Sequence, residues 1–210
     1  MKVLLAVALA VAAGAAGCSG AGVAAPAVAA TAAPAPASAS ASASAELTAG
    51  LLAVNDLPLG FQPQEGAGTT AALGCAGIDG VYLPGPAAHA AVSFAHSLTP
   101  AFVNETITTR TGPAAAAAVT AFAAAARTCA RFTGPDGTAY TVTAVPLPRY
   151  GDGSAALRVR SALAEGRPVE LAAVRVGDLV VAIAAAGSGA GDAALTRTVI
   201  ERALLKLRGR

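Results

Sequence analysis

Two histidines, His89 and His96, are the residues best suited to acid–base catalysis. A hydrolase triad would have to combine one of them with a serine and with one of three aspartates, Asp79, Asp152 or Asp178. No Gly-x-Ser-x-Gly elbow marks a nucleophile, and Ser154 follows Gly-Asp-Gly in a segment typical of a loop. The histidines are seven residues apart, and no third ligand suggests a metal site. We therefore expect a non-enzyme with no catalytic residue, no metal and no other cofactor.

Cys18 has the sequence context of a lipid attachment site. Lys2 gives a positive start, residues 3–16 are almost wholly apolar, and small residues at 15–17 precede the cysteine. The run is shorter than the roughly 20 apolar residues that span a bilayer, and its layout is that of an export signal. It resembles a bacterial lipoprotein signal peptide at 1–17, with acylation (palmitate included) at Cys18. An ordinary secretory signal, with Cys18 incidental, is the alternative.

Export affects how the two remaining cysteines are interpreted. Cys75 and Cys129 would meet an oxidising compartment, where a lone pair most simply forms one disulfide. Two free thiols or a metal pair are the alternatives, but neither cysteine has a histidine or a further cysteine at zinc-like spacing. We predict a Cys75–Cys129 disulfide, worth about 4 kcal/mol by loop-closure entropy.

Four polar residues are candidates for binding a ligand. Within 155–163, a predicted strand, Arg158 and Arg160 alternate with Leu157 and Val159, so one face carries two guanidinium groups. Such a face is either solvated or lines a concave surface that pairs with an anion. Two residues of the preceding loop complete the candidate set: Tyr150, Asp152, Arg158 and Arg160.

Composition limits the partners. Net charge is only +2, and the arginines are dispersed, so no basic stripe indicates nucleic acid and no polybasic cluster indicates anionic lipid. The sequence has no Trp, 3 Tyr and 5 Phe; its core must therefore come from Leu, Val and Ile, with Ala filling. The excess of Ala and of Arg over Lys is typical of a GC-rich genome, such as that of an actinobacterium.

The chain divides into three parts. After the signal peptide at 1–17, residues 18–45 are the lipidated cysteine and an Ala/Ser/Pro tract. This tract cannot form a core, and we predict a disordered linker that lifts a domain off the membrane. Residues 46–210 have a globular composition, and their length suits one domain with a single core.

The globular part alternates strand and helix patterns. We predict a short helix over 48–54, an irregular stretch over 66–86, and main helices beginning at 113 and at 192. Apolar–polar alternation and turn signals predict strands over 92–96, 102–110, 139–147, 155–163, 168–176 and 179–185. Short turns make neighbouring strands antiparallel. The expected fold is α+β: an antiparallel sheet of about six strands with two main helices packed on one face.

Residues 46–208 resemble the extracellular sensor domain of PknH-like mycobacterial serine/threonine kinases. The matching segments are Val-Asn-Glu-Thr at 103–106, the Ala-rich helix to Arg-Thr-Cys-Ala at 127–130, Gly-Cys-Ala-Gly at 74–77, and the final hairpin at 171–183. The family has a second disulfide bridging that hairpin, and no cysteine stands there in this chain. The resemblance implies a domain with a cleft for an extracellular ligand; its members include free-standing lipoproteins.

These features predict a lipid-anchored domain on the extracytoplasmic face of the cell membrane. We expect a non-enzymatic, sensor-like domain that binds an unidentified small molecule. A docking module for another envelope protein is the alternative, and a secreted hydrolase is less favoured. A ligand-binding domain predicts a cavity with convergent polar groups, whereas a docking module predicts an exposed apolar patch.

Overall fold

A computed structural model describes residues 37–65, 71–83, 85–162, 167–187 and 192–209. The signal peptide predicted at 1–17 and Cys18 lie outside the described residues. The described segments belong to one compact unit that spans residues 35–210. Among the described helices, none combines the length and apolar character needed to cross a bilayer.

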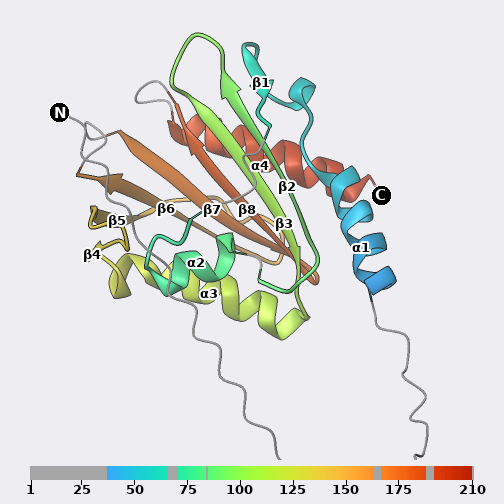
Figure 1. Ribbon diagram of the computed structural model, residues 1–210, viewed down its shortest axis with the longest axis horizontal. Helices are drawn as coiled ribbons and strands as arrows, with labels where there is room; N and C mark the ends of the chain where they lie inside the picture. Colours follow the sequence, from blue (N-terminus) through green and yellow to red (C-terminus); the bar gives the residue numbers. More distant parts are fainter. Residues whose placement is uncertain (1–36, 66–70, 84, 163–166, 188–191, 210) are drawn as a thin grey trace, which may run out of the picture. The chain divides into compact units, whose positions relative to one another are not determined.

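One antiparallel sheet runs through the described residues (Figure 1). Its strands are β1 (Phe61–Pro63), β2 (His89–His96), β3 (Phe102–Thr109), β4 (Arg131–Thr133), β5 (Ala139–Val145), β6 (Gly153–Ser161), β7 (Pro168–Val176) and β8 (Leu179–Ala186). Their order across the sheet is β1-β2-β3-β8-β7-β6-β5-β4. All neighbouring pairs are antiparallel.

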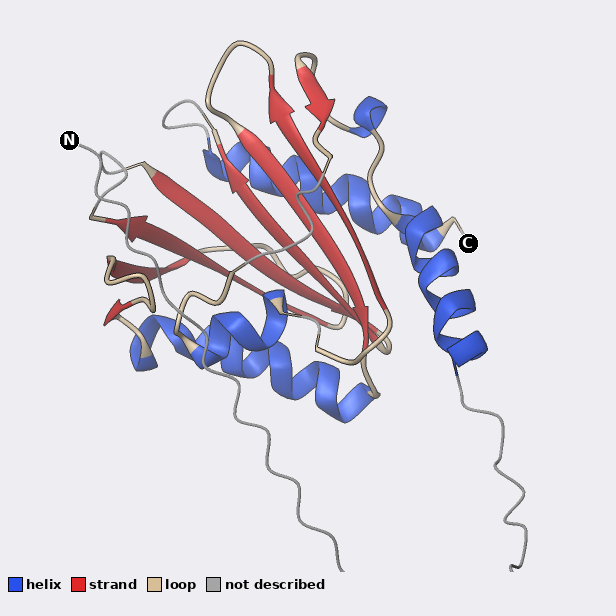
Figure 2. Ribbon diagram, viewed as in Figure 1, coloured by secondary structure: helices blue, strands red, loops and turns tan. Residues whose placement is uncertain are grey.

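Helices cover both faces of this sheet (Figure 2). On one side α1 (Ala37–Gly50) packs on β2, and α4 (Asp192–Arg208) packs on β7 and β8. On the other side α2 (Ala76–Tyr82) packs on α3 (Gly112–Thr128), which covers β5 to β8. A short 3-10 turn, η1 (Val54–Asp56), follows α1. The class α+β and the antiparallel sheet are confirmed, but the prediction of helices on a single face is wrong.

The physical reason is that the two central strands, β7 and β8, are mostly apolar on both faces, with Glu170 and Arg175 as the charged exceptions on β7. On β7, Leu171 and Ala173 face the core under α2 and α3, while Ala172 and Val174 face the core under α1 and α4. Strand β8 alternates in the same way and is buried almost throughout. Because each face of such a strand needs an apolar cover, the sheet lies between two helical layers.

Other departures from the predicted elements are local. The described residues hold eight strands rather than six, because β1 and β4 were not predicted. Helix α2 lies inside the stretch predicted to be irregular. Helix α1 begins at Ala37, inside the predicted disordered linker, so that prediction is wrong for residues 37–45.

A disulfide joins the two helices on one face of the sheet. Cys75 at the N-cap of α2 is bonded to Cys129 at the C-cap of α3, as the sequence predicts. A Cβ atom at Gly77 would lie 2.6 Å from the carbonyl oxygen of Ala121, so glycine allows α2 to lie directly on α3. The Asp79 carboxylate accepts the N–H groups of Leu73 and Gly74. Together these contacts fix the start of α2 and the segment before it.

The end of α2 is fixed by one buried phenol. The Tyr82 hydroxyl donates to the carbonyl oxygen of Ile183 at 2.6 Å and accepts the N–H of Ala172 at 3.1 Å. Ala172 and Ile183 are register partners on β7 and β8, so this hydroxyl ties α2 to the middle of the sheet. Burial raises the pKa of the phenol far above its ordinary value, which keeps it protonated.

We expect Tyr82→Phe to lower the free energy of unfolding by about 2 kcal/mol. The change removes the hydroxyl and leaves polar groups of the buried β7–β8 ladder without this partner, and an unmade buried hydrogen bond costs about 1–3 kcal/mol. Urea unfolding followed by circular dichroism measures the change. Tyr140→Phe, which alters a half-exposed phenol, is the matched control and should stay within about 0.5 kcal/mol of the wild type.

Candidate functional site

An apolar pocket opens on the sheet face that carries α2. Its volume is about 220 Å³, and its floor combines side chains of β3, β5, β6, β7 and β8. Helix α2 and the segment before it form one wall with Leu73, Ile78 and Tyr82. Apolar side chains dominate the floor: Phe102, Val159, Val169, Leu171 and Ala184. We call this hollow the apolar pocket.

A few polar groups converge on the apolar pocket. Asn104 and Thr106 stand two residues apart on β3 and therefore point to the same face. Tyr140 and Ser161, which are register partners on β5 and β6, lie at the opposite side. Arg167 is exposed at the rim, directly before β7. This combination of an apolar lining with few polar groups is typical of a site for a small organic ligand.

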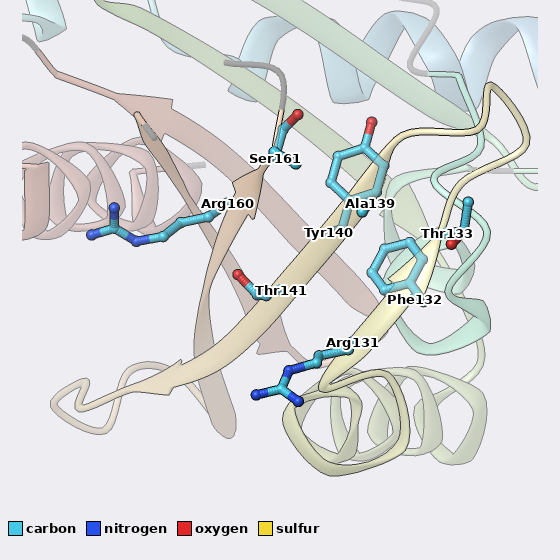
Figure 3. A pocket seen from close by; sticks show the side chains of 9 residues that line it. Arg131, Phe132, Thr133, Ala139, Tyr140, Thr141, Arg160 and Ser161 are labelled. Carbon is cyan, nitrogen blue, oxygen red and sulfur yellow. The ribbon is translucent and has the colours of Figure 1, made fainter. Parts of the chain in front are cut away.

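A second hollow lies at the outer end of the sheet, over β4, β5 and β6 (Figure 3). It is an open trough of about 550 Å³. Its central row is Arg131, Thr141 and Arg160, which are register partners across the three strands. In Figure 3 these three side chains leave the strands on one side, and Phe132 and Tyr140 leave them on the other. We call this hollow the arginine trough.

Two aromatic side chains that also line this hollow hold its strands against the core. Phe132 and Tyr140 are register partners whose rings stack with centroids 5.1 Å apart. Both pack against the core under α2 and α3. Because side chains alternate along a strand, this anchoring of the even positions turns Arg131 and Thr141 outward.

The structure does not bring the four predicted ligand residues together. Asp152 precedes β6 and Arg160 is near its end, so about 26 Å of strand separates them. The Asp152 carboxylate accepts the N–H of Gly177 at 2.7 Å and lies 3.9 Å from Nε of Arg175. The Tyr150 hydroxyl donates to Glu201 Oε1 at 3.0 Å; partial burial and that carboxylate raise the pKa of Tyr150. Both residues hold the 150–153 turn in place.

The two arginines of β6 have different surroundings. Arg158 donates to the Glu170 carboxylate at 2.7 Å, and Glu170 is its register partner on β7, with only 1% of the side chain exposed. A buried carboxylate needs such a partner. Arg158 therefore has a structural role, whereas Arg160 is exposed and lines the trough. Ligand binding by these four residues stays a prediction.

The histidines lie at opposite ends of β2. Seven residues of extended strand separate them by about 24 Å, so they cannot bind one metal ion together. Nδ1 of His89 lies 3.0 Å from the carbonyl oxygen of Ala87, and Nδ1 of His96 accepts the N–H of Leu98. In the described part of the chain, no cluster of three His, Cys, Asp or Glu residues could hold a metal ion.

Sequence reasoning missed most residues of both hollows. Arg131 and Thr141 were not candidates, because β4 was not predicted and nothing placed Arg131 beside Arg160. The lining of the apolar pocket comes from five strands, and only their order in the sheet brings it together. The sequence feature that could have pointed to Thr141 is the alternation of threonine with other residues at 139–143, which indicates a strand with one polar face.

Comparison with known proteins identifies the fold. No model of a protein family matches the chain, and no curated protein matches it. Among solved structures, the chain is similar to the extracellular domain of PknH from Mycobacterium tuberculosis, with a TM-score of 0.60. The match covers 80% of this chain and 97% of that domain, at 18% identity. The described residues therefore share the fold of that extracellular domain.

Proposed function

We propose that this protein is a non-enzymatic, sensor-like domain that binds a small extracytoplasmic ligand in the apolar pocket. The observation that carries the proposal is the pocket itself: an apolar floor drawn from five strands, with a few polar groups at its edges. The cavity is the feature that a ligand-binding domain requires. The extracellular location of the PknH domain with the same fold is consistent with this function.

The pocket indicates the size and character of the ligand. Its volume of about 220 Å³ is below the roughly 300–1,000 Å³ of sites for drug-sized ligands. The ligand is therefore small, or it inserts one segment of a longer molecule. Apolar contacts with the floor supply most of the affinity, while Asn104, Thr106 and the exposed Arg167 orient a polar or anionic end.

The proposal includes the location predicted for the chain. Lipid attachment at Cys18 would tether the domain to the extracytoplasmic face of the cell membrane. Two or more acyl chains anchor a protein stably, whereas one does so only marginally. Metabolic labelling with an alkynyl palmitate analogue tests this: the label should enter the wild type and be absent from Cys18→Ser.

Filling the apolar pocket is expected to abolish ligand binding. Val169 lines the pocket and is half-exposed, so Val169→Phe can place its ring in the hollow without overpacking the core. As the probe we choose 1-anilinonaphthalene-8-sulfonate, an apolar anion whose fluorescence rises in apolar sites. We expect one saturable site per wild-type chain and at least tenfold weaker binding to Val169→Phe.

The control is the same change outside the pocket. Val54→Phe alters an exposed residue of η1 and should bind the probe as the wild type does. Equal binding by Val169→Phe and the wild type would contradict the proposed site. Native mass spectrometry of the protein isolated from its own envelope then identifies the ligand class, since a retained ligand adds a mass that is lost on denaturation.

One observation favours the docking module as a second candidate. Leu59 and Leu98 are 97% and 88% exposed, and they flank the hydrogen bond from the Ser97 N–H to the Gly60 carbonyl. Two exposed leucines side by side are suited to a protein contact. Cross-linking in the native envelope distinguishes the candidates: a partner captured by the wild type and lost in Leu59→Ser/Leu98→Ser would favour docking.

A further inference from the structure

We infer, on the basis of the function proposed above, that the ligand is an amphiphile with a neutral, hydroxyl-bearing head group such as a sugar. Its apolar part lies in the apolar pocket, and its head group lies in an adjoining hollow of about 330 Å³. The polar residues that line this second hollow are Gln64, Thr99 and Asn104. We call it the polar hollow.

The two hollows meet over strand β3, which lies between β2 and β8 in the sheet (Figure 1). Phe102 and Asn104 line both hollows. The register partner of Phe102 on β2 is Ala95, which lines the polar hollow. The register partner of Asn104 on β8 is Ala184, which lines the apolar pocket. Because register partners lie on the same face of a sheet, both hollows open on the face that carries α2, and one molecule can cross β3 to occupy both.

The continuity of the two hollows bears on the length of the ligand. The apolar pocket alone, at about 220 Å³, is small for a whole ligand. Together the two hollows fall within the roughly 300–1,000 Å³ of sites for drug-sized ligands. The ligand is therefore a longer molecule that inserts one apolar segment into the apolar pocket.

Asn104 is an uncommon residue for the middle of a strand, because asparagine is depleted in strands. It is half-buried on a sheet face that is largely apolar. Its amide makes no hydrogen bond to another residue in the described part of the chain. A half-buried amide without a protein partner needs a ligand or water to satisfy it. Asn104 is therefore placed to bind the ligand where it crosses β3.

The polar side chains of the polar hollow are neutral, and none of the described residues that line it is charged. The Gln64 N–H donates to the Ser93 carbonyl oxygen, which holds residue 64 beside β2. The amides of Gln64 and Asn104 and the hydroxyl of Thr99 can each donate and accept. Sugar hydroxyls also do both and can pair with these groups, whereas an ionised head group would lie there without a counter-charge. Arg167, the cationic residue of the apolar pocket, stands before β7, on the other side of β8 from β3.

Calorimetric titration of the full chain with octyl β-D-glucoside, kept below the concentration at which it forms micelles, tests the inference. We expect one saturable site, with binding about tenfold weaker in Asn104→Leu and about threefold weaker in Gln64→Leu, because each variant removes hydrogen bonds to the sugar. Octyl sulfate has the same chain with an anionic head group, and its affinity should be unchanged in Gln64→Leu. Anilinonaphthalene sulfonate should also bind Gln64→Leu as it binds the wild type.

Asn55→Leu is the matched control, because it makes the same change at an exposed residue of η1. It should bind octyl glucoside within about twofold of the wild type. Equal binding of octyl glucoside by the wild type, Gln64→Leu and Asn104→Leu, with anilinonaphthalene sulfonate still bound, would overturn this inference alone. Absence of a saturable site for both probes would overturn the proposed function and this inference with it.

Discussion

Loss of the Cys75–Cys129 disulfide is expected to lower the free energy of unfolding by about 4 kcal/mol. The bridge joins residues 54 apart in sequence, and a cross-link of that span removes about this much loop-closure entropy from the unfolded chain. Cys75 is fully buried, so few alternative contacts replace it. Urea unfolding of the oxidised protein, the reduced protein and Cys75→Ala/Cys129→Ala measures the difference.

Without the disulfide, the apolar pocket should lose its structure before the whole domain unfolds. The disulfide fixes the start of α2, and Leu73 and Ile78, on either side of Cys75, line the pocket. We therefore expect the reduced protein to lose anilinonaphthalene sulfonate binding at urea concentrations at which the sheet is still folded. Cys18→Ala is the control, since it removes a cysteine outside the bridge. If the free energy of unfolding of Cys75→Ala/Cys129→Ala lay within 1 kcal/mol of the wild-type value, the prediction would be contradicted.

Long elements could be predicted from the sequence because their patterns are local. Strand β3 follows the alternation within 102–110, and β7 and β8 follow from the Gly-Asp turn at 177–178. Helix α3 begins at Gly112, next to the proline that marks its first turn. In each case the chain repeats its signal over two or more turns or strand periods, and no distant contact is needed to define the element.

Short elements could not be predicted, because tertiary contacts create them. Strands β1 and β4 have three residues each, too few to show alternation, and they exist because β2 and β5 offer partners. Helix α2 contains Gly77 and Gly80, which disfavour a helix. It forms because the disulfide, Gly77 packing on α3 and the Tyr82 hydroxyl fix both of its ends.

The apolar character of β8 in the sequence already favours a sheet that is covered on both faces. Residues 179–186 are Leu-Val-Val-Ala-Ile-Ala-Ala-Ala, with no polar position in eight. A strand with one solvated face alternates, whereas a strand covered on both faces is continuously apolar. That run predicts helices on both sides. The trough, in contrast, depends on which strands lie next to each other, and sequence order alone does not specify that arrangement.

Stability should fall as pH rises from about 4.5 to above 7, because of Glu105. This carboxyl group on β3 is fully buried. Its Oε2 accepts the N–H of Leu52, just after α1, at 2.6 Å, and its Oε1 has no hydrogen-bond partner among the described residues. Burial raises its pKa from 4.5 to about 7; the Leu52 N–H and Lys206 oppose the rise, and Asp56 adds to it.

The direction follows from proton linkage. The folded protein holds the Glu105 proton more tightly than the unfolded chain, so this contribution to stability is complete below about pH 4.5 and is lost as pH rises through 7. A shift of this size corresponds to about 3 kcal/mol. Glu105→Gln mimics the protonated group, and in thermal unfolding it should lose most of the pH dependence between 5 and 8.

The control for the Glu105 prediction is a glutamate that is exposed. Glu65→Gln changes an exposed glutamate and should keep the wild-type pH dependence of thermal unfolding. If Glu105→Gln also kept the wild-type pH dependence, the assignment to Glu105 would be contradicted.

Lys206 binds the Leu51 carbonyl and Asp56, on the same segment that Glu105 holds. Because one lysine and one buried carboxyl fix the segment after α1, ionisation of Glu105 should weaken it first. Hydrogen exchange at Leu52 should therefore quicken above pH 7 by more than the base-catalysed rate alone explains.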